Sequence, residues 1–184
     1  MLDLSLRLRV DASCIGRSNA DNGTKSAPTC QNAQIISSST ISSGDDAVEL
    51  AMFSCAPLVR TQAQPPTVTN ICAETCECAN TCLQTGLLSF PPSSGDCSRL
   101  ADTLTTSLTN GTSPTIDVGP GQMWMASRGT CKFSFFNFGP TTVETCILSI
   151  VRFATSSVSS CFGSLIPTSS EALCAANSGL WEVT

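Results

Sequence analysis

Twelve cysteines in a chain of 184 residues constrain this fold more than any other feature of the sequence. They are spread along the whole chain, whereas the ligands of one metal site usually lie within short spacers. The spread favours disulfides, and therefore an oxidising compartment. We predict a secreted, extracellular protein with six disulfides, formed by Cys14, Cys30, Cys55, Cys72, Cys76, Cys78, Cys82, Cys97, Cys131, Cys146, Cys161 and Cys174.

Four of these cysteines stand close together in residues 71–82, ICAETCECANTC, with the spacing C-x3-C-x-C-x3-C. Zinc and iron–sulfur sites usually use C-x2-C pairs, so we expect no metal here. The preferred interpretation is a short helical knot whose bridges run to distant cysteines. Seven cysteines precede residue 90 and five follow it, so complete pairing requires at least one bridge between the two parts. The sequence leaves the pairing itself open.

Charge composition excludes several classes of function. The net charge is −5 and the nine basic residues are scattered singly, so the chain lacks the basic face that nucleic-acid binding requires. There is no histidine, which removes Ser-His-Asp and Cys-His catalysis and histidine metal sites. No apolar run is long enough to span a membrane. We expect no cofactor, and the sequence makes no prediction of the oligomeric state.

The first ten residues alternate leucine with polar and charged residues, which predicts a strand over residues 2–10. This pattern lacks the apolar core of a signal peptide, so we expect a mature form with an added Met1. Asn22 and Asn110 each begin an Asn-Gly-Thr sequon, and each is either a glycosylation site or an exposed turn.

The densest apolar pattern lies between residues 121 and 162. Residues 131–138 alternate, with Cys131, Phe133, Phe135 and Asn137 on one face, and they predict the second strand of a hairpin. Its turn is expected at residues 127–130, where a glycine allows positive φ. A helix should follow, with a capping box at Thr141 to Glu144 and an apolar stripe over residues 146–158.

The remaining elements are assigned from turn and capping signals. Before residue 90 we predict polar loops over 14–43, a short helix from 43 to 56 and an extended connector over 61–69. The Pro-rich segment 90–94 is the best candidate for the boundary between the N-terminal extension and the rest of the chain. After it come a helix from 95 to 109, a strand over 115–126 broken at Gly119-Pro120, the hairpin strand, the second helix, and short strands at 174–176 and 180–183.

This order predicts an α+β protein. An antiparallel sheet in αββαββ order, formed by residues 95–184, is covered on one face by two helices. Residues 1–94 form a disulfide-rich extension packed on that core, and the bridges join the two parts into one covalent unit.

Four short motifs carry a resemblance to known proteins: Gly95-Asp96-Cys97, Gly129-Thr130-Cys131-Lys132-Phe133, Ile150-Val151-Arg152-Phe153 and Gly179-Leu180-Trp181. Over roughly residues 95–184 the chain resembles fungal small secreted cysteine-rich proteins. One branch is the mushroom glycan-binding type with an αββαββ fold, and the other is the killer-toxin-like and necrosis-inducing effector type. The resemblance implies recognition of a carbohydrate or cell-surface glycan, or else a toxin or effector role.

A sugar stacks its C–H face on an indole, and its hydroxyls need planar donors and acceptors. We expect such a site on the face of the sheet away from the helices, with Trp124 as the first stacking residue and Trp181 as the second. The alternative is that both indoles are core residues. The candidate ligand-binding residues are Trp124, Arg128, Asp117, Asn137 and Trp181.

Paired carboxylates could hydrolyse glycosides without histidine. The candidates are Asp45, Asp46, Glu49, Asp117, Glu144 and Glu182. Charge at helix N-termini and exposed strand positions account for most of them, and the cysteines are expected to be oxidised. We therefore predict binding rather than catalysis. A hydrolase and a protease inhibitor are the remaining alternatives.

Overall fold

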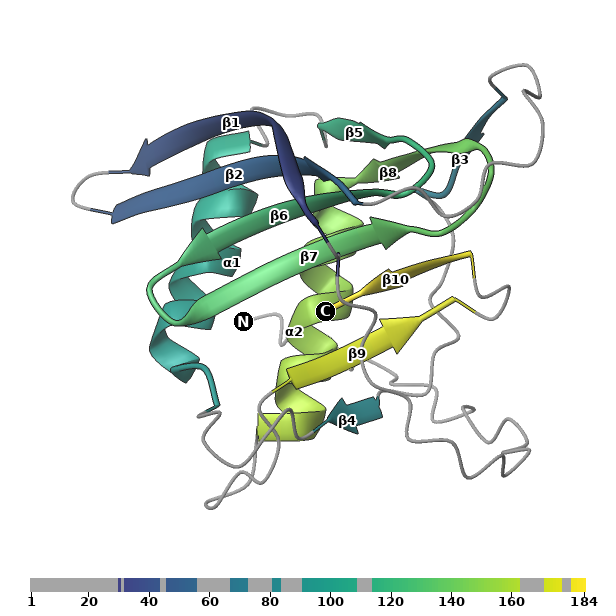
Figure 1. Ribbon diagram of the computed structural model, residues 1–184. Coiled ribbons are helices and arrows are strands. Elements are labelled where there is room, and N and C mark those ends of the chain that lie inside the picture. The colour runs from purple at the N-terminus through teal and green to yellow at the C-terminus, as the bar shows by residue number, and fades with distance from the viewer. Residues whose placement is uncertain are drawn as a thin grey trace, which may run out of the picture.

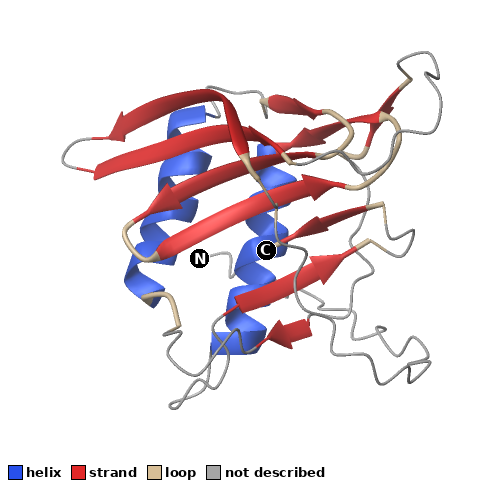
Figure 2. Cartoon of the chain, viewed as in Figure 1, coloured by secondary structure: helices blue, strands red, loops and turns tan. Residues whose placement is uncertain are grey.

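The computed structural model describes residues 30, 32–43, 46–55, 67–72, 81–83, 91–108, 114–162, 171–176 and 180–184. In these ranges two helices lie behind a large sheet, and a smaller sheet lies beside one end of it (Figures 1 and 2). The elements in chain order are β1 (Gln34–Ser43), β2 (Asp46–Ser54), β3 (Val68–Asn70), β4 (Thr81–Leu83), α1 (Ser94–Leu108), β5 (Thr115–Val118), β6 (Gln122–Arg128), β7 (Cys131–Asn137), β8 (Thr142–Cys146), α2 (Ile147–Phe162), β9 (Glu171–Ala175) and β10 (Trp181–Val183).

The large sheet has seven strands in the order β1-β2-β6-β7-β10-β9-β4, and every neighbouring pair in it is antiparallel. The small sheet has the order β3-β8-β5, in which only the β3–β8 pair is parallel. The predicted α+β class, with a mainly antiparallel sheet covered on one face by two helices, is confirmed.

Strand alternation decides which side chains enter the core. In β7 the predicted set of Cys131, Phe133, Phe135 and Asn137 is buried, and it faces the helices. The two helices pack apolar stripes against these side chains. The stripe of α1 contains Leu100 and Leu104, and that of α2 contains Ile147, Ile150, Val151 and Ala154. The core therefore lies between the sheet and the two helices. We call the opposite side of the sheet, which Figure 1 shows toward the viewer, the outer face.

The hairpin between β6 and β7 forms as predicted, with Arg128 opposite Cys131. Gly129 in its turn has φ of 55°, which a glycine adopts without the steric penalty of a side chain. A Cβ atom at this position would also come within 2.6 Å of the Asp96 carboxylate at the start of α1. Glycine is thus required here by the backbone angle and by the helix that packs against the turn.

The second helix forms, but the capping box predicted at Thr141 to Glu144 is wrong. This stretch is strand β8, and α2 begins directly after it at Ile147. Val143 and Thr145 are buried with the period of two that a strand requires. Backbone pairing with β5 on one side and β3 on the other outweighs the local preference for a cap.

Two predictions before residue 90 are also wrong. The short helix predicted from residue 43 is strand β2, and the polar loop expected at residues 33–43 is strand β1. The two strands pair from Ser43 opposite Asp46 to Gln34 opposite Ser54, with a bulge near Ile35. Val48 and Met52 fit a helix stripe, yet with Leu50 between them they equally fit one face of a strand. Pairing of β2 with β6 selects the strand.

The predicted break at Gly119-Pro120 separates two strands that enter different sheets, β5 in the small sheet and β6 in the large one. The two short strands predicted near the end of the chain are β9 and β10, which pair antiparallel. Residues 2–10, Asn22 and Asn110 lie outside the described residues, as do positions 73–80 of the knot predicted at 71–82, so the predictions made for them stay predictions. At the end of the knot, Thr81 and Cys82 belong to strand β4 and not to a helix. The bridges of Cys72 and Cys82 run to distant cysteines, as predicted.

Four disulfides lie within the described residues: Cys30–Cys55, Cys72–Cys146, Cys82–Cys161 and Cys97–Cys131. Cys174 is also disulfide-bonded, whereas Cys14, Cys76 and Cys78 lie outside the described ranges. Two of the four bridges connect residues before 90 with residues after it, as the cysteine count requires. Strands β1, β2 and β4 also belong to the large sheet and β3 belongs to the small one, so the described strands of residues 1–94 share both sheets with the rest.

Candidate functional site

Both tryptophans lie on the helix side of the large sheet. Trp124 and Trp181 are each 4% exposed and belong to the hydrophobic core. The Trp181 ring lies between two phenylalanines, with centroids 5.6 Å from Phe135 and 5.8 Å from Phe153 of α2. The structure therefore supports the core alternative for both indoles. Neither presents a face on which a sugar could stack.

Asn137 is fully buried at the end of β7 and satisfies three backbone groups. Its Nδ2 donates to the carbonyl oxygens of Val118 and Thr141, each at 2.8 Å. Its Oδ1 accepts from the amide of Gly139 at 2.8 Å. These bonds use both side-chain donors and hold the β5–β6 and β7–β8 connections together. Because Asn137 is also fully buried, it is not available to a ligand.

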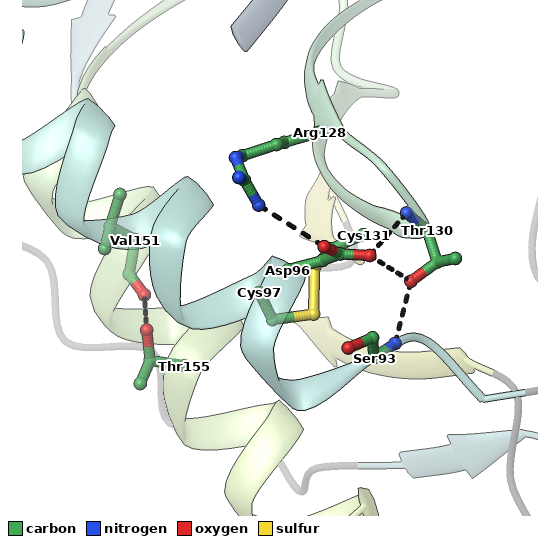
Figure 3. Close-up of a disulfide and its surroundings, with 8 residues drawn as sticks. All are labelled: Ser93, Asp96, Cys97, Arg128, Thr130, Cys131, Val151 and Thr155. Carbon is green, nitrogen blue, oxygen red and sulfur yellow. Dashed lines mark hydrogen bonds and ion pairs between the residues drawn. A yellow bond between two sulfur atoms is a disulfide. The ribbon is translucent and has the colours of Figure 1, made fainter. Parts of the chain in front are cut away.

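Arg128 belongs to a polar cluster that joins the hairpin turn to the first turn of α1 (Figure 3). Its Nη1 lies 3.3 Å from Asp96 Oδ1. Thr130 donates to Asp96 Oδ2 from its amide at 2.9 Å and from its hydroxyl at 2.8 Å. These hydrogen bonds from Thr130, assisted by the Arg128 charge, lower the pKa of Asp96 below its ordinary value. The Cys97–Cys131 disulfide lies beside this cluster, which we interpret as a structural corner.

Asp117 is exposed on β5, in the small sheet, opposite Glu144 of β8. Glu144 in turn accepts a hydrogen bond from the side-chain amide of Asn70. The five residues proposed from the sequence thus lie in four different places. The two tryptophans are in the core, Asn137 bonds backbone groups at the end of β7, Arg128 belongs to the corner between the hairpin and α1, and Asp117 is in the small sheet. The fold does not bring them together into one site.

A different group of polar side chains meets on the outer face of the large sheet. Glu182 of β10 lies opposite Phe136 of β7, which lies opposite Met123 of β6. The neighbours of Glu182 along β10, Trp181 and Val183, point into the core, so Glu182 points outward. The same alternation places Glu171 of β9 on the outer face, two strands away from Phe136.

These side chains line a cavity of about 300 Å³, which we call the outer-face pocket. Its size is at the lower end of the range in which proteins bind small ligands. The wall combines two carboxylates and two hydroxyls, from Glu171, Glu182, Ser134 and Thr184, with the less polar side chains of Cys30, Ala33, Met123 and Phe136. Apolar walls with a few convergent polar groups are typical of a ligand site.

The pKa values of both carboxyl groups in the outer-face pocket are raised. Glu182 is 8% exposed, and its burial raises its pKa to about 7, with a further contribution from the negative charge of Glu171. Burial also raises the pKa of Glu171 above its ordinary value. Perturbed carboxyl groups that share a pocket are typical of functional sites. Near neutral pH, Glu182 can therefore act either as a hydrogen-bond donor or as an acceptor.

We expect the protein to become less stable as the pH rises through the titration of Glu182. The pKa of this carboxyl is about 7 in the folded chain against an ordinary value of 4.5, so its proton stabilises the fold. This stabilisation is complete below pH 4.5 and is lost as the pH rises through about 7. Glu182→Gln, which stays neutral, should remove this part of the pH dependence when urea unfolding is measured between pH 4.5 and 8. The control Glu49→Gln changes an exposed carboxylate of β2, and an equal effect of both variants would contradict the assignment.

From the sequence, Glu182 is expected to occupy an exposed strand position, and no role is predicted for Glu171. The available signal was the position of Glu182 between Trp181 and Val183 in an alternating strand. That pattern places the Glu182 side chain on the face opposite the core. Whether this face is flat there or contains a pocket depends on the side chains of β7 and β9. No local pattern carries that information.

Two general properties follow from the described ranges. Neither helix in them is long and apolar enough to cross a membrane. Within the same ranges, no three His, Cys, Asp or Glu side chains are grouped so that they could hold a metal ion.

Comparison of the chain with protein-family models, with curated proteins and with solved structures found no match in any of the three. The resemblance to fungal small secreted proteins therefore depends on the four short motifs in the sequence. The function must be argued from the residues of the outer-face pocket.

Proposed function

We propose that this protein is a secreted recognition protein that binds carbohydrate in the outer-face pocket, without chemical conversion of its ligand. The observation that carries the proposal is the meeting of Glu171 and Glu182 with Ser134, Thr184 and an apolar wall in one cavity. Carboxylates and hydroxyls bind the hydroxyls of a sugar, and the apolar wall contacts its C–H groups. This site replaces the tryptophan platform expected from the sequence.

Secretion is part of the same proposal. Each of the nine cysteines in the described ranges is disulfide-bonded. Structural disulfides persist in oxidising compartments and are rare in reducing ones. Disulfides that join the sheet to the helices are also typical of a protein that acts outside the cell.

The test is a glycan array probed with the wild-type chain, Glu182→Gln and the control Glu49→Gln. Replacing a carboxylate that accepts a hydrogen bond from a sugar should weaken binding at pH 8 by about tenfold or more, because hydrogen bonds to charged groups are the stronger kind. Glu49→Gln should leave the affinity unchanged, since this exposed side chain does not line the pocket.

Three outcomes would contradict the proposal. Equal binding by Glu182→Gln and the wild type would remove the outer-face pocket from the site. Release of sugar products from a bound glycan would indicate a hydrolase that uses the two carboxylates. No glycan binding, together with membrane permeabilisation or plant-cell necrosis, would favour the effector alternative.

A further inference from the structure

Glu182 is the more deeply buried of the two carboxylates in the outer-face pocket, with 8% of its surface exposed. Among the described residues its carboxylate has no hydrogen-bond or ion-pair partner, and its charge is opposed by that of Glu171. Burying a charged group costs free energy unless the group is paired. The side chain is therefore placed for a partner that a ligand would supply.

The side chains around the two carboxylates do not balance their charge. The other lining side chains are uncharged and come from Cys30, Ala33, Met123, Ser134, Phe136 and Thr184. Lys132 is the one charged residue of β7, but it is exposed and does not line this pocket. The described lining thus places two carboxylates, Glu171 and Glu182, in one cavity without a cation.

The chemistry of the outer-face pocket fits an ammonium group better than a metal ion. Calcium takes about six to eight oxygen ligands, whereas the lining offers two carboxylates and two hydroxyls. A primary ammonium donates three hydrogen bonds, which Glu171, Glu182 and one hydroxyl can accept. Its positive charge also favours the ionised form of both carboxyl groups, and this offsets the cost of burying them.

Phe136 provides a second interaction for a cation. It lies opposite Glu182 in the pairing of β7 with β10, and Cβ atoms of such opposite residues are about 4.5–5.5 Å apart. An aromatic ring attracts an ammonium within about 6 Å of its centre. Met123 lies opposite Phe136 on the other side and continues the apolar wall, which suits the C–H groups of a sugar.

We propose that the carbohydrate bound in the outer-face pocket is an amino sugar with a protonated amine. This inference rests on the proposed function and names the class of its ligand. The ammonium would bind between Glu171 and Glu182, and the sugar ring would contact Phe136 and Met123. N-acetylation removes the charge and two of the three donors, so it should weaken binding. Acidic sugars should be excluded, because they would add a third negative charge.

The probes are a glucosamine trisaccharide with free amines and its fully N-acetylated form, titrated into the full chain at pH 7 by calorimetry. The free-amine form should bind about tenfold more tightly or better, because hydrogen bonds to charged groups are the stronger kind. 1,4-Diaminobutane carries ammonium groups without a sugar and should bind more weakly than the free-amine trisaccharide. Equal affinity of this diamine would contradict the assignment to a sugar.

Variants test the same preference from the protein side. Glu182→Gln keeps the size of the side chain but loses its charge, so the preference for the free amine should fall to about twofold or less. Glu171→Gln, on a different strand, should act in the same direction. Glu49→Gln lies three strands away from β10 in the sheet and should keep the preference. Because the preference is a ratio measured on one variant, partial unfolding of a variant does not alter it.

NMR titration of the side-chain carboxyl carbon of Glu182 gives an independent measurement. Saturation with the free-amine trisaccharide should lower the pKa of Glu182 from about 7, because a nearby cation favours the ionised form. Equal affinity for the two trisaccharides, an unchanged preference in Glu182→Gln or an unchanged pKa would each overturn the inference. If neutral glycans still bound in such a case, the carbohydrate function would stand, whereas loss of all glycan binding would remove both.

Discussion

Trp124→Ala is expected to lower the free energy of unfolding by about 3–5 kcal/mol, the usual cost of removing a large aromatic side chain from a core. Trp124 is 4% exposed and lies opposite Phe135 on one side and Met52 on the other. Its loss would leave a cavity between the sheet and the helices. Urea unfolding followed by circular dichroism measures this effect.

A matched variant in the same strand separates core packing from a general effect on β6. Met125→Ala truncates the neighbouring side chain, which lies on the outer face and is half-buried. It should cost clearly less than Trp124→Ala. If the tryptophan variant kept its stability but lost glycan binding, the indole would be part of a binding site after all.

Removal of the Cys82–Cys161 bridge by the double change Cys82→Ala and Cys161→Ala is the second large effect. The bridge joins β4, an edge strand of the large sheet, to the end of α2 across a sequence separation of 79 residues. Because the Cys72–Cys146 bridge stays closed in this variant, the loop that Cys82–Cys161 closes runs through it and contains about 25 residues, 10 from position 72 to 82 and 15 from 146 to 161. A loop of this length predicts a loss of about 3.5 kcal/mol from chain entropy. Domains of this kind have about 5–15 kcal/mol of stability in total, so the loss would be between about a quarter and about two thirds of it.

The Cys30–Cys55 bridge provides a matched comparison. It spans 25 residues, so its removal by the equivalent alanine pair should cost about 3.5 kcal/mol. The two bridges should therefore contribute about equally in urea unfolding of the oxidised proteins. A clear difference between them would mean that strain or packing at the bridges, and not loop length, determines their contribution.

The sequence predicted the elements whose local pattern and final packing agree. β7 alternates between core and outer positions over its whole length, and Gly129 stands where the turn requires a positive φ. α2 carries an apolar stripe that matches the sheet below it. In each case a short window contains the information, because the same periodicity that places the side chains also determines the element.

The predictions failed where a distant strand decides between two local options. Val48 and Met52 fit a helix or a strand, and pairing of β2 with β1 and β6 makes them a strand. Thr141 to Glu144 can cap a helix, but β5 and β3 take residues 142–144 into the small sheet. The pairings of β2 with β6 and of β8 with β5 and β3 join segments more than 20 residues apart, which no window of local sequence reports.

The candidate site was missed for a related reason. Trp124 and Trp181 have the chemistry of a sugar platform, yet they stand on the same strand faces as Ala126 and Val183, which belong to the core. Glu171 and Glu182 lie on the other face. Their meeting depends on the pairing of β9 with β10 and of β10 with β7.

The strand order also determines when this protein can fold as the ribosome makes it. β10 is the last described strand in the sequence, but it lies inside the large sheet between β7 and β9. Strands β1, β2, β6 and β7 can pair in the order of synthesis, and Cys30–Cys55 can close among them. β9 and β4 join the sheet only through β10, and long-range pairing of this kind is slow. β4, which carries Cys82, can therefore take its place in the sheet only after β10 has been made.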